Sequence, residues 1–438
     1  MKRLTSTCVL LFGITTLAFG QGLPMTVPEK VGFSAQRLER IRPVMQDYVD
    51  KGHVPGFLTV VARRGKIVHF ETIGMRDIEN EKPIEPDTLF RIHSMSKPIT
   101  SVAVMMLYED GHFKLDTPVS NFIPEFKDMK VYNADQTEIL EAKNEVTIKH
   151  LLTHTAGLTY GWGGKPVDKR YRESNIFERG ATLADMAKRL TAIPLVHEPG
   201  ERWTYSVSTD VLGYLVQVVS GMPFEEFLQT RLFRPLGMVD TAFSVPLEKV
   251  DRFAALYQLN KEGRMKGDKD KEKKTDSAIE KEKKVREDKD PKTRLERVEK
   301  DPPLENDEVR FFPGGGGGLV STAPDYMRFC QMLLNNGELE GVRILKAETV
   351  ERMRYPHHDG WFGLGFSIVN DKESKDTDDK EPKDTPESIG SYSWGGAAGT
   401  IFWIDPEMEL IGLLMTQISD PASSHDQFKV LTYQALIK

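Results

Sequence analysis

Apolar residues along the chain follow two spacings, one typical of strands near both ends and one typical of helices in the middle. Close to the N-terminus, Ser34 is placed to cap a helix whose apolar face holds Leu38, Ile41, Met45 and Tyr48. Strands are predicted over residues 57–62 and 67–73, joined by the polar turn Arg63-Arg64-Gly65-Lys66. Near the C-terminus, strands are predicted over 364–369, 392–394, 400–404 and 410–415, before a helix over 426–437.

The middle of the chain has the spacing of helices. Helices are predicted over 98–110 and 223–236, and Thr182 with Asp185 forms a capping box for another. Ser208 is placed to cap a further helix with an apolar face of Leu212, Leu215 and Val219. Strands at both ends and helices between them predict an α/β (α+β) fold. In this fold an antiparallel sheet forms from both chain ends, helices flank it, and a mainly helical lobe is inserted.

Two charged segments interrupt this pattern. The predicted sheet lobe covers about residues 30–97 and 305–438, and the helical lobe about 98–260. Segments rich in Lys, Asp and Glu, at about 262–304 and 371–387, have almost no large apolar residue to bury. They are therefore predicted to be solvated insertions in loops. Alternating charge in the first leaves an exposed helix as the alternative.

Residues 1–20 differ from the rest of the chain. Two basic residues precede an apolar stretch over 9–19, and Ala18 and Gly20 provide small residues at −3 and −1 of a cut before Gln21. This pattern predicts a secretory signal peptide and a periplasmic or secreted protein, with a buried N-terminal helix as the alternative. No other run is long enough to cross a bilayer, so no membrane insertion is expected after cleavage.

Composition narrows the range of partners. The 438 residues carry a net charge of −7, with 39% hydrophobic and 29% charged residues, as in a soluble globular protein. The sequence has no basic stripe of the kind that binds nucleic acid, so no nucleic-acid partner is expected. Cleavage of the signal peptide would leave Cys330 as the last cysteine, so no intrachain disulfide is expected. Cys330 shares a helix face with Met327 and Leu333, which favours a buried apolar role.

Ser94 and Lys97 stand three residues apart, just before Pro98 and an apolar run. Proline fits a helix only in its first turn, so a helix should begin at or just before Ser94. The two side chains then share one face, and Ser94 lies at the positive end of the helix dipole. That setting suits an acyl-transfer nucleophile, although a serine at a helix start is more often only a cap.

Two later segments supply partners for Ser94. Tyr205 precedes the helix after Ser208, and Trp394-Gly395-Gly396-Ala397 lies on a late strand. With S-x-x-K at Ser94, they match the order and approximate spacing of the S-x-x-K, Y-x-N and K-T-G motifs of serine β-lactamases and penicillin-binding proteins. The chain most resembles the class C β-lactamase-like family, above all the family VIII carboxylesterases, over roughly residues 30–260 and 305–438.

The resemblance implies a β-lactamase/transpeptidase-like catalytic domain over residues 21–438, in which Ser94 forms an acyl-enzyme. Lys97 and Tyr205 are the two candidates for the base that takes the serine proton, and the sequence does not choose between them. The family also implies an oxyanion hole from the backbone N–H groups of Ser94 and Ala397. The residues expected to bind the oxyanion or the substrate are Ala397, Trp394, Gly395, Gly396, Val207 and Tyr160.

Two departures from the family motifs bear on the substrate. Trp394 replaces the lysine that helps bind the carboxylate of a β-lactam or a peptide terminus, and it offers an apolar wall instead. Val207 stands where many relatives have the asparagine that contacts the substrate amide. Both changes favour neutral, apolar esters. Tyr160 and Trp162 are expected to line the pocket, with ordinary packing as the alternative.

Other candidate sites are less favoured. His93 and His154 leave a Ser-His-Asp triad conceivable, but adjacent residues on a helix point in different directions. The segment His357-His358-Asp359 has no third ligand at a useful metal-binding spacing. The five glycines from Gly314 to Gly318 lack the lysine that follows a phosphate-binding loop, which favours close backbone packing. No metal and no cofactor are expected.

The sequence therefore predicts an exported serine hydrolase, most simply a carboxylesterase of class EC 3.1.1, acting on a small-molecule ester or related acyl substrate. A β-lactamase, a D-alanine-type peptidase or an acyltransferase on the same site is the alternative. A non-catalytic cell-wall-binding module is the second alternative. The natural acyl and acceptor groups and the oligomeric state are left open.

Overall fold

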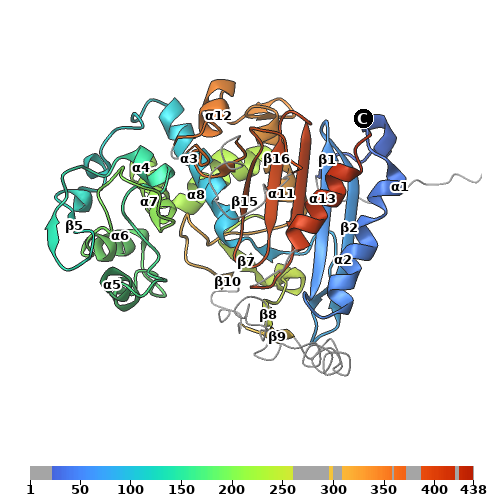
Figure 1. The fold of residues 1–438 in the computed structure, drawn as a ribbon, viewed down its shortest axis with the longest axis horizontal. Coiled ribbons are helices and arrows are strands. Elements are labelled where there is room, and N and C mark those ends of the chain that lie inside the picture. Colours follow the sequence, from blue (N-terminus) through green and yellow to red (C-terminus); the bar gives the residue numbers. More distant parts are fainter. Residues whose placement is uncertain are drawn as a thin grey trace, which may run out of the picture.

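The two ends of the chain pair in one seven-stranded antiparallel sheet (Figure 1). In β1 and β17, Leu58 lies opposite Met415 and Arg63 lies opposite Leu410. The predicted sheet built from both chain ends, with helices inserted between them, is thus confirmed. The order across the sheet is β14 (Ser367–Ile368), β15 (Tyr392–Gly395), β16 (Ile401–Asp405), β17 (Leu410–Met415), β1 (Gly56–Arg63), β2 (Lys66–Asp77) and β3 (Lys82–Pro83).

The structure is a computed structural model that describes residues 22–259, 295–298, 308–357, 360–370, 386–419 and 424–437. The predicted signal peptide, most of the two predicted charged insertions, and His358 with Asp359 lie outside the described residues. None of the described helices is both long and apolar enough to cross a membrane.

Local sequence explains where the strands begin and end. Arg64 and Gly65, with φ of 52° and 72°, form the two-residue turn between β1 and β2, as the hairpin pattern predicts. The strand predicted over 364–369 is wrong in length, because only Ser367–Ile368 pairs with β15. Gly365 has a φ of 108° and cannot continue an extended strand.

Helices cover both faces of the sheet. Side chains of β1 alternate, so that Phe57 and Val61 pack in one apolar cluster and Leu58 and Val60 in another. The first cluster includes α1 (Ala35–Leu38), α2 (Ile41–Asp50) and α13 (Ser424–Gln434), and the second includes α3 (Ser96–Glu109) and α11 (Ala323–Leu334). The single helix predicted after Ser34 is two helices, because Pro43 has no N–H to donate to the carbonyl of Glu39.

A helical lobe, at the left of Figure 1, holds most of the middle of the chain. The capping box of Thr182 and Asp185 is confirmed. Ser208 is not a cap, because Val207 occupies that position and the Ser208 hydroxyl lies 2.8 Å from Ser206 Oγ instead. The helix predicted over 223–236 contains a π turn before Pro235. The lobe comprises α4 (Ile148–Leu152), α5 (Pro166–Ser174), α6 (Leu183–Thr191), α7 (Ser208–Ser220), α8 (Phe224–Leu228), η5 (Gln229–Phe233) and α9 (Arg234–Leu236).

The remaining described elements are short. They are the strand pairs β4 (Phe90–Arg91) with β11 (Val320–Ser321), β5 (Lys130–Tyr132) with β6 (Ile139–Glu141), β7 (Ser244–Pro246) with β10 (Glu308–Arg310), β8 (Tyr257–Leu259) with β9 (Leu295–Arg297) and β12 (Glu338–Leu339) with β13 (Val342–Arg343), and the helices η1 (Pro28–Val31), η2 (His93–Met95), η3 (Val119–Asn121), η4 (Pro124–Phe126), η6 (Leu247–Arg252) and α12 (Ala347–Met353).

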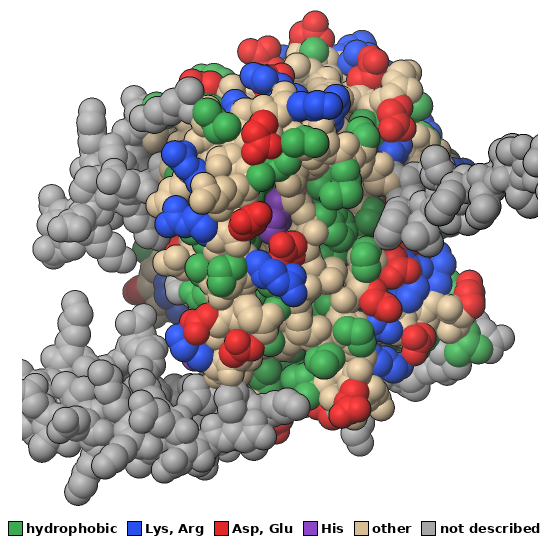
Figure 2. Space-filling view, turned by 90° about the vertical axis from the view of Figure 1, so that its right-hand side faces the viewer, with side chains coloured by type: hydrophobic (Ala, Val, Ile, Leu, Met, Phe, Trp, Pro, Cys, Tyr) green, Lys and Arg blue, Asp and Glu red, His purple; other side chains and the backbone are tan. Residues whose placement is uncertain are grey.

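Charges of both signs are interspersed on the outer face over α1 and α2 (Figure 2). Exposed ion pairs there include Lys51 with Asp47 at 2.6 Å and Arg42 with Glu71 at 3.0 Å. Neither sign forms a continuous stripe on this face. Such exposed pairs contribute little to stability because water screens them.

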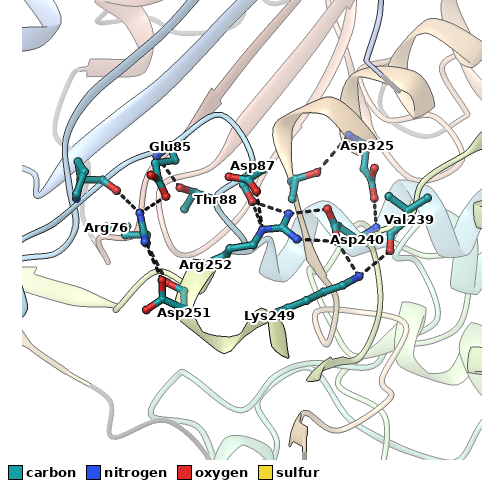
Figure 3. A network of polar contacts seen from close by, with 12 residues as sticks. Arg76, Glu85, Asp87, Thr88, Val239, Asp240, Lys249, Asp251, Arg252 and Asp325 are labelled. Carbon is teal, nitrogen blue, oxygen red and sulfur yellow. Dashed lines mark hydrogen bonds and ion pairs between the residues drawn. The ribbon is translucent and has the colours of Figure 1, made fainter. Parts of the chain in front are cut away.

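A partly buried ion-pair network around Arg252 joins η6 to the loops that hold Asp87 and Asp240 (Figure 3). Arg252, in η6, binds Asp240 through two nitrogens at 2.6 and 3.1 Å and contacts Asp87 at 2.9 Å. Lys249 lies 2.8 Å from the same Asp240 carboxylate. Burial raises the pKa of Asp240, but hydrogen bonds and charge from Arg252 and Lys249 together lower it below its ordinary value.

Arg252→Ala should lower the free energy of unfolding by about 1–3 kcal/mol, because it leaves the Asp240 carboxylate without its bidentate partner. Because the folded-state pKa of Asp240 is lowered, this stabilisation is present above the unfolded pKa of about 4 and is lost as pH falls. Urea unfolding at pH 7 and at pH 3.5 measures both effects.

Arg64→Ala is the matched control, since the Arg64–Glu409 pair is exposed on both sides. It should cost less than about 0.5 kcal/mol. Equal destabilisation by the two variants at pH 7 would show that the network in Figure 3 stabilises the fold no more than an exposed ion pair does.

Candidate active site

Ser94 lies in a sharp turn between a strand and a long helix. The turn is the 3-10 helix η2, which runs directly into α3, so a helix does begin just before Ser94 as predicted. His93, the residue before Ser94, has a φ of 40°, a left-handed conformation that is uncommon for residues other than glycine. The Ile92 N–H donates to the Leu319 carbonyl at 3.1 Å, which anchors the start of the turn. The side chain of Ser94 is half-buried.

Lys97 and Tyr205 both contact the Ser94 hydroxyl. Lys97 Nζ donates to Ser94 Oγ at 3.2 Å, and the Tyr205 hydroxyl lies 2.6 Å from the same oxygen. Lys97 Nζ also lies 4.8 Å from the centre of the Tyr205 ring. Ser94 and Lys97 come from η2 and α3, whereas Tyr205 comes from the segment before α7. The structure therefore brings the three predicted catalytic residues together.

The ammonium of Lys97 makes two further hydrogen bonds. It donates to the Tyr160 hydroxyl at 2.9 Å and to the Gly316 carbonyl at 2.6 Å. With Ser94 these contacts use all three donors of a charged lysine. The side chain is only 1% exposed, so these partners replace water around the ammonium. Tyr160 thus contacts the Lys97 ammonium directly.

Most of the glycine run lies where side chains have no room, Gly317 being the exception. A Cβ at Gly315 would lie 2.4 Å from the Thr209 carbonyl, and one at Gly318 would lie 2.1 Å from the Phe312 carbonyl. The Thr100 hydroxyl donates to the Gly315 carbonyl at 2.8 Å. The predicted close backbone packing of Gly314 to Gly318 is confirmed.

The third motif lies at the end of β15, against the turn that holds Ser94. A Cβ at Gly396 would lie 2.3 Å from the Ile92 carbonyl, so the two backbones touch. Gly395 is the last residue of β15, and Ala397 follows in an exposed loop. The Trp394 ring lies 5.7 Å from the Tyr205 ring. Val207 differs from these residues because it is fully buried in the core at the start of α7.

Aromatic rings surround Tyr205. Five ring centres lie between 5.1 and 6.0 Å from its own, those of His154, Tyr160, Trp394, Trp162 and Trp203. Trp162 is 75% exposed and stacks on Tyr160 with ring centres 4.6 Å apart. The site therefore has an apolar wall that reaches the surface beside the nucleophile.

Sequence reasoning missed several members of the site. Trp203 stands two residues before Tyr205, so alternation along an extended segment could have indicated it. Trp361 and Phe362, which contact Trp203 at 4.9 and 5.8 Å, follow no motif. Asp210 is a charged residue within an apolar helix and is only 3% exposed, a combination that marks a partnered carboxylate.

The buried histidine His154 has a partner other than Ser94, and His93 is partly buried. His154 Nδ1 lies 3.2 Å from Ser206 Oγ, and burial with the charge of Lys97 lowers its pKa well below the ordinary value. Burial, with the charges of Arg91 and Lys97, lowers the pKa of His93 to about 4. In the part of the chain that the structure describes, no three His, Cys, Asp or Glu side chains gather as a metal site requires. Cys330 is buried.

Known proteins are similar to this chain over most of its length. The sequence model of the family described as Beta-lactamase matches residues 41–434. Protein Rv1367c of Mycobacterium tuberculosis is 33% identical over 395 residues, which cover 85% of this chain and 88% of that protein. Esterase EstB of Burkholderia gladioli is 30% identical over 400 residues, which cover 87% of this chain and 91% of that protein.

Solved structures resemble the whole architecture. EstCE1, described as a hydrolase with promiscuous acyltransferase activity, matches with a TM-score of 0.71 at 25% identity, over 91% of this chain and 99% of that chain. This likeness confirms the predicted β-lactamase/transpeptidase-like fold.

Both buried histidines should stay neutral between pH 5 and pH 8, because each imidazolium would be buried beside Lys97. ¹H–¹⁵N spectra that report ring protonation check this, with signals assigned by loss in His93→Asn and His154→Asn. Asparagine tolerates the positive φ of both positions. A ring that titrates near pH 6.5 would show that one of these histidines is available as a proton acceptor.

Proposed function

The chain belongs to the Beta-lactamase family of serine hydrolases, and from that premise we propose that it cleaves carboxylic esters through an acyl-Ser94 intermediate. One observation carries the proposal. The Ser94 hydroxyl is hydrogen-bonded at once to Lys97 and to Tyr205, the two side chains able to take its proton.

The proposed reaction has two halves. Ser94 Oγ attacks the ester carbonyl while its proton passes to Lys97 or Tyr205, and the alcohol leaves with a proton from the same pair. Water then attacks the acyl-serine, the acid is released, and Ser94 regains its proton. Backbone N–H groups of Ser94 and Ala397 are the proposed donors to the oxyanion, and each donor would be worth about 10²–10³ in rate.

Apolar surroundings favour neutral substrates. Trp394 and Trp162 add apolar surface beside Tyr205, where a carboxylate would find no cation from the third motif. Burying apolar groups of a small ester against these rings is favourable, whereas burying an unpaired carboxylate is costly. We therefore expect neutral esters to be better substrates than β-lactams.

The remaining proposals concern context. The predicted signal peptide supports export to the periplasm or beyond, and the hydrolysis needs no cofactor. A small-molecule ester or related acyl compound is the expected partner.

Ser94→Ala should lower turnover of short-chain p-nitrophenyl esters by at least about 10³-fold, because no other nucleophile lies beside Lys97 and Tyr205 in the described site. A phosphonate inhibitor should label Ser94 of the unaltered protein, as read by mass spectrometry. Cys330→Ala is the matched control and should keep its turnover.

A chromogenic cephalosporin in parallel separates the alternatives. Faster hydrolysis of the cephalosporin than of the esters would contradict the role assigned to Trp394 and favour a β-lactamase. Absence of both turnover and label would favour a binding module.

Acyl transfer is the second candidate, because EstCE1 is described as having promiscuous acyltransferase activity. With an added short-chain alcohol, hydrolysis should remain the main outcome and a transfer ester the minor one, because water is far more concentrated. Chromatography of the two products gives the ratio, and Ser94→Ala should remove both. A transfer ester that exceeds the acid at millimolar alcohol would make acyltransferase the better description.

A further inference from the structure

A buried carboxylate, that of Asp210, lies close enough to Lys97 for the two charges to interact. Asp210 is the third residue of α7 and is 3% exposed. Its Oδ1 accepts a hydrogen bond from the Gly316 N–H at 2.9 Å. Its Oδ2 is buried, and hydrogen bonding between the carboxylate and the Tyr160 hydroxyl opposes the rise that burial causes in the pKa of Asp210. Burying a carboxylate oxygen costs free energy unless a nearby positive charge compensates.

A single residue, Gly316, links this carboxylate to Lys97. The Gly316 carbonyl accepts from Lys97 Nζ at 2.6 Å, while the N–H of the same residue donates to Asp210. Tyr160 is a second link, because its hydroxyl accepts from Lys97 and, after burial, the Asp210 charge contributes to raising its pKa well above the ordinary value. Asp210 and Lys97 are thus linked through Gly316 and Tyr160.

The glycine run gives Asp210 its place. A Cβ at Gly316 would lie 2.3 Å from Asp210 Oδ2, and one at Gly314 would lie 2.4 Å from Oδ1. Any side chain at either position would therefore push the carboxylate away. At Gly317 the nearest atom to such a Cβ is 3.7 Å away, which is ordinary contact.

Asp210 is the candidate for the negative charge that balances Lys97. A buried ammonium needs a counter-charge, and Lys97 is 1% exposed. Of the described titratable groups that face Lys97, one is an acid, two are histidines kept neutral by burial and two are phenols; they are Asp210, His93, His154, Tyr160 and Tyr205. Burial raises the pKa of Asp210, and the charge of Lys97 opposes that rise.

We propose that Asp210 is a positioning residue that keeps Lys97 charged and holds its ammonium against Ser94 and Tyr205. A charged lysine has no lone pair to take the serine proton, so Tyr205, reacting as its phenolate, is left as the acceptor. The inference rests on the proposed acyl-Ser94 function and adds to it the group that sets the state of the lysine.

Asp210→Asn tests the role of the charge, because asparagine keeps the shape and still offers an oxygen to the Gly316 N–H. The rate at which a phosphonate labels Ser94 is measured from pH 5 to pH 11. Without the carboxylate the site loses its buried negative charge, so the alkaline limb of the rate profile should move to lower pH. The rate at pH 8 should fall at least about tenfold.

Asp325→Asn is the matched control. Asp325 is 4% exposed and accepts from the Asp240 N–H at 2.7 Å and the Thr241 hydroxyl at 2.8 Å, so it is equally buried with different partners. Its variant should lose stability on heating but keep the profile of the unaltered protein.

Gly316→Ala and Gly317→Ala test the geometry without changing any charge. The first should displace Asp210 and move the alkaline limb in the same direction as Asp210→Asn, whereas the second should not. This pair also keeps the proposal testable if Asp210→Asn does not fold.

A folded Asp210→Asn protein with an unmoved profile would overturn the role of Asp210 while leaving the proposed function intact. An unaltered protein that takes no label at Ser94 would contradict the proposed function itself and, with it, this inference.

Discussion

The pairing of β1 with β17 is the constraint on which the rest of the molecule depends. It fixes the two chain ends in one sheet and turns the segment after β4 towards the helical lobe. Ser94 then lies where the end of β15 and the start of α3 meet. Residues of the site come from five separate parts of the sequence, near positions 94, 160, 205, 316 and 394. They can meet only because the sheet holds these parts in fixed relation.

Within that frame, a charge buried in an apolar site decides the local arrangement. Lys97 has exchanged water for a serine, a phenol and a peptide carbonyl. Desolvation of an ammonium is offset only when the polar partners are complete and correctly placed. Gly314, Gly315 and Gly316 are the means of placing them, because only a backbone without side chains approaches α3 and α7 so closely. The conformational entropy that these glycines lose on folding is thus offset by the polar contacts that they allow around Lys97.

Sequence patterns predicted what depends on local chemistry. The hairpin at Arg64-Gly65 and the cap at Thr182 follow from residue type alone, and spacing within S-x-x-K indicated the shared face of Ser94 and Lys97. Features that depend on contacts between residues far apart in the sequence were not predicted. The role of Asp210 depends on a glycine about a hundred positions later. Trp361 joins the aromatic wall only through tertiary packing.

The sheet built from both chain ends also governs when the site can exist. Strand β1 has neighbours on both sides, and one of them is the last strand in the sequence. Contacts between residues far apart in sequence form late, since the intervening chain must first lose conformational freedom. During synthesis Ser94 emerges long before β15 and β17. The site around Ser94 therefore cannot assemble until those two strands are available. Reactivity and completion of the fold are therefore reached together.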